Sequence, residues 1–116
     1  MRSLFAFCLV LLAAGCAPTP ERPADRGEQF TYRIANSPYA AAICIARNAR
    51  ARAGNTAEER TVGASSTEVI VRGRGGETLA TARVDNDGTF SSAAVLVTPA
   101  VRADREGFAR QLMQGC

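Results

Sequence analysis

Apolar and polar positions divide the chain into three regions. An apolar run extends from Leu4 to Ala14 and follows a single positive charge at Arg2. Residues 17–29 are rich in proline and charge and poor in apolar side chains, so we expect a semi-rigid, extended spacer there. From residue 30 onward, apolar positions recur with the periods of helices and strands. This pattern predicts one small folded domain over residues 30–116.

Two stretches of this domain carry helical signals. Ser37-Pro38 is a favourable helix start, because serine caps the first turn and proline suits the first helical position. The pattern predicts a helix over about 39–53, and a second helix from Val101 or Asp104 to the end of the chain. The expected apolar faces consist of Tyr39, Ala42, Ile43, Ala46, Ala49 and Ala53 in the first helix, and of Phe108, Ala109, Leu112, Met113 and Cys116 in the second.

Three strands are expected between the helices, over residues 67–72, 78–84 and 89–97, joined by turns. Residues 30–34 alternate apolar and polar side chains, which fits a short strand or an extended lead-in. The polar segment 56–66 is expected to be a loop. The predicted fold is α+β: a small three-stranded antiparallel meander with two helices on one face, in the order α-β-β-β-α, stapled by one disulfide.

The first region has the organisation of a secretion signal. A positive charge precedes an apolar core that is too short to span a bilayer, and small residues follow it. The segment Leu12-Ala13-Ala14-Gly15-Cys16 resembles the lipobox of bacterial lipoproteins, although Ala13 stands where leucine is usual. The resemblance covers residues 1–17. It implies cleavage between Gly15 and Cys16, a diacylglycerol thioether on Cys16, and an acyl chain such as palmitate on its amine.

This resemblance sets the expected organisation and location of the protein. It implies a signal peptide over residues 1–15, a lipidated cysteine and tether over 16–29, and a periplasmic domain over 30–116. Because Ala17 rather than aspartate follows the lipidated cysteine, it also implies sorting to the outer membrane, with the domain on the periplasmic face. Several acyl chains anchor a protein stably. An ordinary signal peptide or a buried core helix are the alternatives.

The four cysteines can be assigned by elimination. Cys8 would leave with the signal peptide, and Cys16 would carry the lipid. Cys44 and Cys116 remain, and we predict that they form a disulfide because the expected compartment is oxidising. A metal site and two buried free thiols are the alternatives. The sequence has no histidine and would keep no third free thiol, so a zinc site lacks ligands.

The charge of the chain is mild. All fourteen basic residues are arginines against eleven acidic residues, for a net charge of +3 that does not indicate nucleic-acid binding. Arg47, Arg50, Arg72 and Arg74 could together contact an anionic surface or an acidic partner. Scattered, solvated arginines explain the same residues. The Arg72–Gly76 segment resembles an RGG repeat of RNA-binding tails, but an exposed hairpin edge is the preferred interpretation.

The sequence does not indicate a catalytic mechanism. Histidine and lysine are absent, so no serine has an evident activating base. We therefore expect a non-enzymatic accessory, binding or structural lipoprotein of the envelope, with no cofactor apart from the lipid on Cys16. Its expected partners are the membrane and another envelope component. The alternatives are a carboxylate-dependent hydrolase of cell-wall or glycan material, and a binder of an anionic ligand through the arginines.

Overall fold

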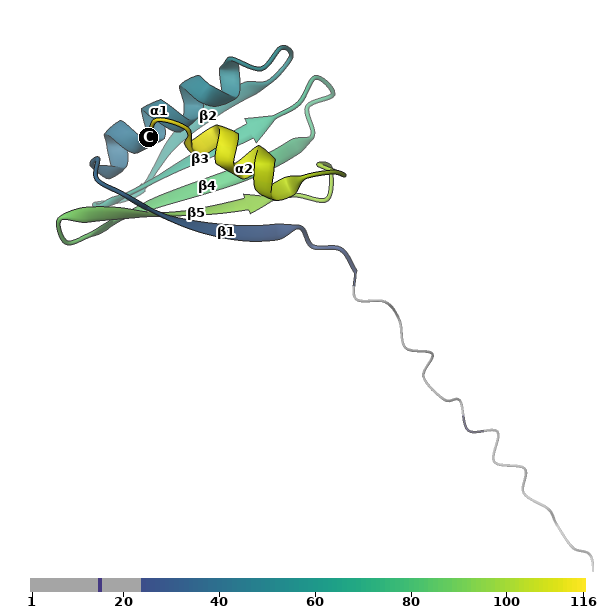
Figure 1. Ribbon diagram of the computed structural model, residues 1–116, viewed down its shortest axis with the longest axis horizontal. Coiled ribbons are helices and arrows are strands. Elements are labelled where there is room, and N and C mark those ends of the chain that lie inside the picture. The colour runs from purple at the N-terminus through teal and green to yellow at the C-terminus, as the bar shows by residue number, and fades with distance from the viewer. Residues whose placement is uncertain (1–14, 16–23) are drawn as a thin grey trace, which may run out of the picture.

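The computed structural model of the protein describes Gly15 and residues 24–116 (Figure 1). The predicted signal peptide, apart from Gly15, and Cys16 lie outside the described residues. The described chain forms β1 (Glu28–Ile34), α1 (Pro38–Arg50), β2 (Thr56–Gly63), β3 (Ser66–Arg72), β4 (Thr78–Asp87), β5 (Phe90–Val97) and α2 (Arg105–Met113).

The strands form one antiparallel sheet in the order β1-β5-β4-β3-β2. β1 and β2 follow each other in the chain but lie at opposite edges, so α1 crosses the sheet to join them (Figure 1). α2 packs beside α1 and against β5 and β1. Both helices share one core with the same side of the sheet. We call that side the helix face and the opposite side the open face, because no helix of residues 24–116 covers it.

The prediction of a three-stranded meander is wrong, because the sheet has five strands. The expected loop at residues 56–66 contains β2, which pairs with β3 from Thr56 to Gly63. On the helix face, β2 places only one apolar residue, the half-buried Ala57, followed by Glu59 and Thr61. The strand therefore lacks the apolar alternation by which strands are recognised, and pairing with its neighbour stabilises it instead.

The segment expected to be a strand or lead-in at residues 30–34 is also a full strand. β1 starts at Glu28 and pairs with β5 along its length. Ile34 is buried, and Phe30 and Tyr32 are partly buried against the same core, as the alternation predicts. β1 thus joins the beginning of the described chain to the last strand of the sheet.

α1 begins as predicted but is rotated about its axis relative to the expectation. Ser37 caps the helix, with its Oγ accepting from the N–H of Ala40 at 3.3 Å. Tyr39 and Ile43, expected in the core, are 68% and 38% exposed. Ala42, Ala46 and Ala49 are buried as predicted, and Ala41, Cys44 and Ile45 complete the buried face in place of Tyr39 and Ile43. Its alanines let the helix backbone approach the strands closely, and this close fit decides the rotation.

The sheet side of the core is also built from small and β-branched residues. It is formed by Ile34, Val69, Val71, Ala80, Ala82, Val84, Ala93, Val95 and Val97. Phe108 and Leu112 of α2 complete it and are buried as predicted. Short side chains on both sides leave little space between helix and sheet, so larger residues on either side would overpack the core.

The predicted disulfide between Cys44 and Cys116 is present and ties α1 to the end of the chain. Because α1 is rotated, Cys44 lies within its buried face and is 7% exposed. Asn48 of α1 supports the same connection, since its amide donates to the carbonyls of Leu112 and Gln114, both at 2.8 Å. The carboxyl-terminal segment is therefore fixed by a covalent bond and by hydrogen bonds.

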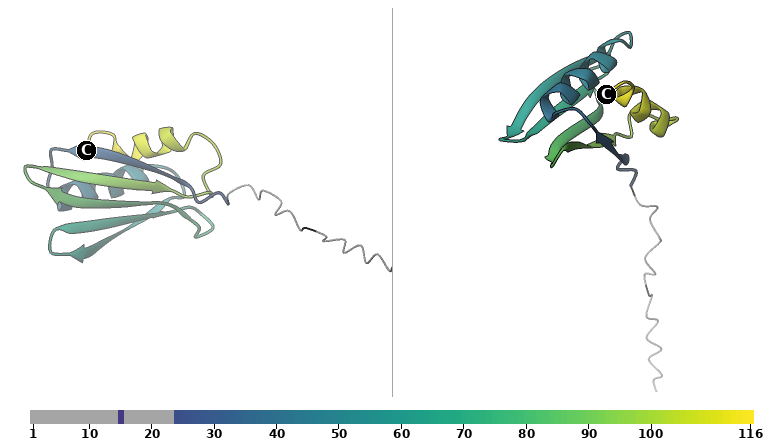
Figure 2. Two further views of the ribbon diagram at one scale, coloured as in Figure 1. Left: turned by 90° about the horizontal axis from the view of Figure 1, so that it is seen from below. Right: turned by 60° about the vertical axis from the view of Figure 1, so that its left-hand side comes forward.

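The domain has two distinct ends (Figures 1 and 2). At the entry end, residues 24–28 lead into β1, close to the loop that follows β5. The distal end contains the start of α1, the β2–β3 turn and the β4–β5 turn.

The chain is held tightly where it enters the domain. Arg105 donates to both carboxylate oxygens of Asp25, at 2.6 and 3.0 Å, and this bond lowers the pKa of Asp25. Gly27 has a positive φ of 87°, and a Cβ there would come within 2.1 Å of the carbonyl oxygen of Val97. Only glycine fits this close approach.

Candidate binding site

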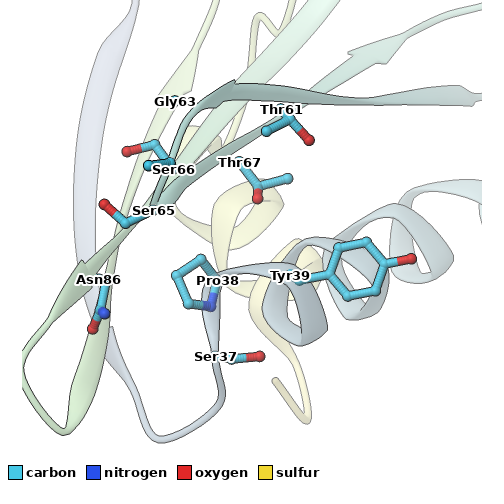
Figure 3. Close-up of a pocket in the computed structure, with 10 residues that line it drawn as sticks. Ser37, Pro38, Tyr39, Thr61, Gly63, Ser65, Ser66, Thr67 and Asn86 are labelled. Carbon is cyan, nitrogen blue, oxygen red and sulfur yellow. The ribbon is translucent and has the colours of Figure 1, made fainter.

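A pocket of about 330 Å³ lies at the distal end, between the first turn of α1 and the β2–β3 hairpin (Figure 3). This volume is at the lower end of the range for small-molecule sites. We call it the distal pocket. It is lined by Ser37, Pro38, Tyr39, Thr61, Gly63, Ala64, Ser65, Ser66, Thr67 and Asn86, none of which carries a charge.

The floor of the distal pocket is the amino-terminal turn of α1. Pro38 occupies the first helical position, and the ring of Tyr39 extends along the helix surface (Figure 3). Proline has no N–H, and Ser37 accepts from the N–H groups of both Ala40 and Ala41. Among the first backbone donors of the helix, only that of Tyr39 lacks a partner within the described chain. This helix start therefore offers a mainly ring-lined surface, with little capacity to bind an anion.

The roof is a cross-strand pair of threonines, Thr61 on β2 and Thr67 on β3. Thr67 is 8% exposed, and its hydroxyl points toward Pro38 and Tyr39 (Figure 3). No hydrogen bond of this hydroxyl is found with any residue of 24–116. In the described residues, every side-chain nitrogen or oxygen that solvent cannot reach has a hydrogen-bond partner. Since the Thr67 hydroxyl has no such partner, solvent reaches it, and it opens onto the pocket. The register shift between Thr61 and Gly63 ends the regular pairing beside it.

The side of the pocket is held by contacts between the hairpin and β4. The N–H of Asn86 donates to the carbonyl of Ser65 at 3.1 Å. The hydroxyl of Ser66 donates to the carboxylate of Asp85, and this hydrogen bond, helped by Arg83, lowers the pKa of Asp85. The carboxylate of Asp85, which pairs with the hairpin, is thus occupied by its own partners, and the lining residues offer hydroxyl and amide groups.

A larger cavity of about 600 Å³ lies beside β1 and α2, lined by Tyr32, Asp104, Gly107, Arg110, Gln111, Met113 and Gln114. Burial raises the pKa of Tyr32. This cavity has one carboxylate and one guanidinium, and its other polar side chains are those of Tyr32, Gln111 and Gln114. It offers no convergent set of groups comparable to the threonines of the distal pocket.

The four predicted arginines lie on α1, at the end of β3 and in the turn that follows β3. Arg47 and Arg50 lie on α1, where Arg50 donates to the carbonyl of Ala57 at 2.9 Å. Arg72 instead pairs with Glu58 at 3.0 Å, and Arg74 lies against Gly54 in the loop after α1. Two of these arginines are therefore engaged with neighbouring groups of the chain.

The adjacent carboxylates of Glu58 and Glu59 do not face one common site. Glu58 and Glu59 are neighbours on β2 and point to opposite faces of the sheet, where Glu58 pairs with Arg72 and Glu59 with Arg50. The guanidinium of Arg72 lowers the pKa of Glu58. Neither of the two cavities described above has more than one carboxylate in its lining. Within residues 24–116, no three His, Cys, Asp or Glu side chains gather to hold a metal ion.

Comparisons with protein families, curated proteins and solved structures found no match to this chain. The described helices include none that is long and apolar enough to cross a membrane. The fold and the disulfide define a small α+β domain with the distal pocket at one end.

The distal pocket is not predicted from the sequence. Tyr39 is expected in the core and residues 56–66 in a loop, so nothing in the pattern makes Thr61 and Thr67 partners. One signal was available: Thr61 and Thr67 flank a short Gly-Ala-Ser-Ser segment typical of a turn. A hairpin around that turn brings both threonines to the same face.

Proposed function

We propose that this protein is a lipid-anchored bacterial envelope protein whose domain binds another envelope component at the distal pocket, without catalysing a reaction. The observation that carries the proposal is that the entry end and the distal pocket lie at opposite ends of the domain. The tether would hold the entry end toward the membrane, so the distal pocket would face the periplasm.

Two features support export and anchoring. The lipobox-like segment ends at Cys16, and the disulfide between Cys44 and Cys116 suits an oxidising compartment. The clamp of Arg105 on Asp25 fixes where the tether leaves the domain, so that residues from Cys16 to about Asp25 would remain available as a spacer.

The composition of the distal pocket supports binding rather than catalysis. Its lining contains hydroxyl, amide and ring groups but no carboxylate, thiol or other base that could activate a nucleophile. Such a surface can recognise a ligand by shape and hydrogen bonds.

Lipid labelling and site-specific crosslinking test the proposal in a Gram-negative host. Labelled palmitate should enter the wild-type protein and not a Cys16→Ser variant. A photoreactive residue at Ala64, which lines the pocket, should give an adduct in intact cells, whereas the same residue at the exposed Ala100 of the entry end should not. Absence of the lipid, or equal adducts at both positions, would contradict the proposal.

A further inference from the structure

We infer that the distal pocket binds an uncharged saccharide, with one sugar ring on the Pro38–Tyr39 floor beneath the hydroxyls of Thr61 and Thr67. This inference deepens the proposed function and rests on it.

The electrostatics of the pocket favour a neutral ligand. None of its lining residues carries a charge, and the nearby Asp85 is occupied by Ser66 and Arg83. An anion would meet only one free backbone donor at the start of α1, since Ser37 satisfies the next two. A cation would meet no free carboxylate among the lining residues. A ligand therefore gains the most binding free energy here if it is neutral and binds through hydrogen bonds and apolar contacts.

The arrangement of the groups matches a ring that is apolar on its faces and polar around its rim. Tyr39 is 68% exposed, and its ring extends from the pocket along α1, beside the ring of Pro38 (Figure 3). The threonine hydroxyls lie opposite, and each can both donate and accept a hydrogen bond. A pyranose has C–H groups on its faces and hydroxyls at its rim, so it can contact both sides of the pocket at once.

Thr67 provides the most specific evidence for a polar ligand. Its residue is more than nine-tenths buried, yet its hydroxyl has no partner in the described chain and points into the pocket. A polar group held in such a position is stabilised when a ligand or water hydrogen-bonds to it. A valine would fill the same space without this requirement.

The apolar surface continues beyond the pocket along α1. Ile43 lies one helical turn after Tyr39, on the same side of the helix, and is 38% exposed. A second sugar ring of the same saccharide could contact Ile43. We therefore expect an oligosaccharide to bind more tightly than its monosaccharide.

The test is calorimetric titration of the full chain, extracted in mild detergent, with β-1,4-linked tri-N-acetylglucosamine and separately with inorganic phosphate. The saccharide should bind and phosphate should not. Tyr39→Ala and Thr67→Val should each weaken saccharide binding about five- to tenfold, through lost ring contact and a lost hydrogen bond. Thr67→Ser, which keeps the hydroxyl, should restore most of the affinity.

Two variants serve as matched controls. Phe90→Ala removes an exposed ring at the same end of the domain, and Thr81→Val removes a threonine hydroxyl from a neighbouring strand of the sheet. Both should bind the saccharide as the wild type does. Circular dichroism of each variant verifies that it is folded.

The outcomes separate this inference from the proposed function. Equal saccharide binding by wild type, Tyr39→Ala and Thr67→Val would overturn the inference, as would binding of phosphate at this site. Loss of affinity in a folded Thr67→Ser equal to that in Thr67→Val would also overturn it. A pocket-specific adduct at Ala64 without saccharide binding would leave the proposed function standing and exclude the saccharide. Failure of lipid labelling or of the Ala64 adduct would instead contradict the proposed function.

Discussion

Removal of the disulfide should destabilise the domain by several kcal/mol. Cys44 and Cys116 are separated by 72 residues. The chain-entropy model gives about 3 kcal/mol for a loop of about 15 residues and about 4.7 kcal/mol for one of about 100 residues, hence roughly 4.4 kcal/mol here. Small domains are stable by roughly 5–15 kcal/mol in total, so this loss would be a large share.

The measurement is urea unfolding of the oxidised wild type and of the double variant Cys44→Ala/Cys116→Ala. The midpoint should fall, and the slope m should rise, because an unfolded chain without the cross-link exposes more surface. A Cys16→Ala variant is the matched control, since Cys16 lies outside the described domain, and it should unfold like the wild type.

A loss below about 1 kcal/mol with unchanged m would refute the loop-entropy reasoning. Such a result would mean that hydrogen bonds hold the chain end in place even without the disulfide. These are the bonds from Asn48 to Leu112 and Gln114, and from Asn36 to the carbonyl of Cys116. Adding Asn48→Ala to the double variant should then cause the loss that the cysteines did not.

Three further predictions concern the entry end, the pocket rim and the core. Arg105→Gln should leave the fold intact but raise hydrogen exchange and protease cleavage at residues 24–27, because the clamp on Asp25 is lost; Arg102→Gln, at an exposed neighbouring arginine, should not. Ser66→Ala should lower stability at neutral pH. Because the pKa of Asp85 is lowered in the folded state, its ionised carboxylate stabilises the fold at any pH above the ordinary pKa of aspartate. This stability is lost as the pH falls through the lowered pKa of the folded state, so the urea midpoints of variant and wild type should converge under acid conditions. Leu112→Ala should cost roughly 2–5 kcal/mol in urea unfolding, because this residue is 1% exposed, whereas Gln111→Ala beside it should cost little.

Local signals in the sequence predicted the parts of the fold that depend on local chemistry. Ser37 and Pro38 marked the start of α1, and the hairpins between β3, β4 and β5 followed from turn residues and alternation. The cysteine pairing followed from the expected compartment, because only two thiols remained.

The features that the sequence did not reveal depend on contacts between distant segments. β2 carries only two apolar side chains beyond glycine, those of Ala57 and Val62, and its pairing with β3 is not visible in this pattern. The rotation of α1, which exposes Tyr39 and buries Ile45, is decided by how alanines fit against the sheet. The distal pocket combines both features, so it could not be found before the strands were placed.

The pairing of β1 with β5 also determines when this domain can fold during synthesis. The first strand of the domain completes its hydrogen bonds only against the last strand, which ends at Val97, and α2 and the disulfide come later still. Such long-range pairing slows folding. β1 therefore cannot pair until most of the chain has been synthesised, a delay that would suit the export that we propose.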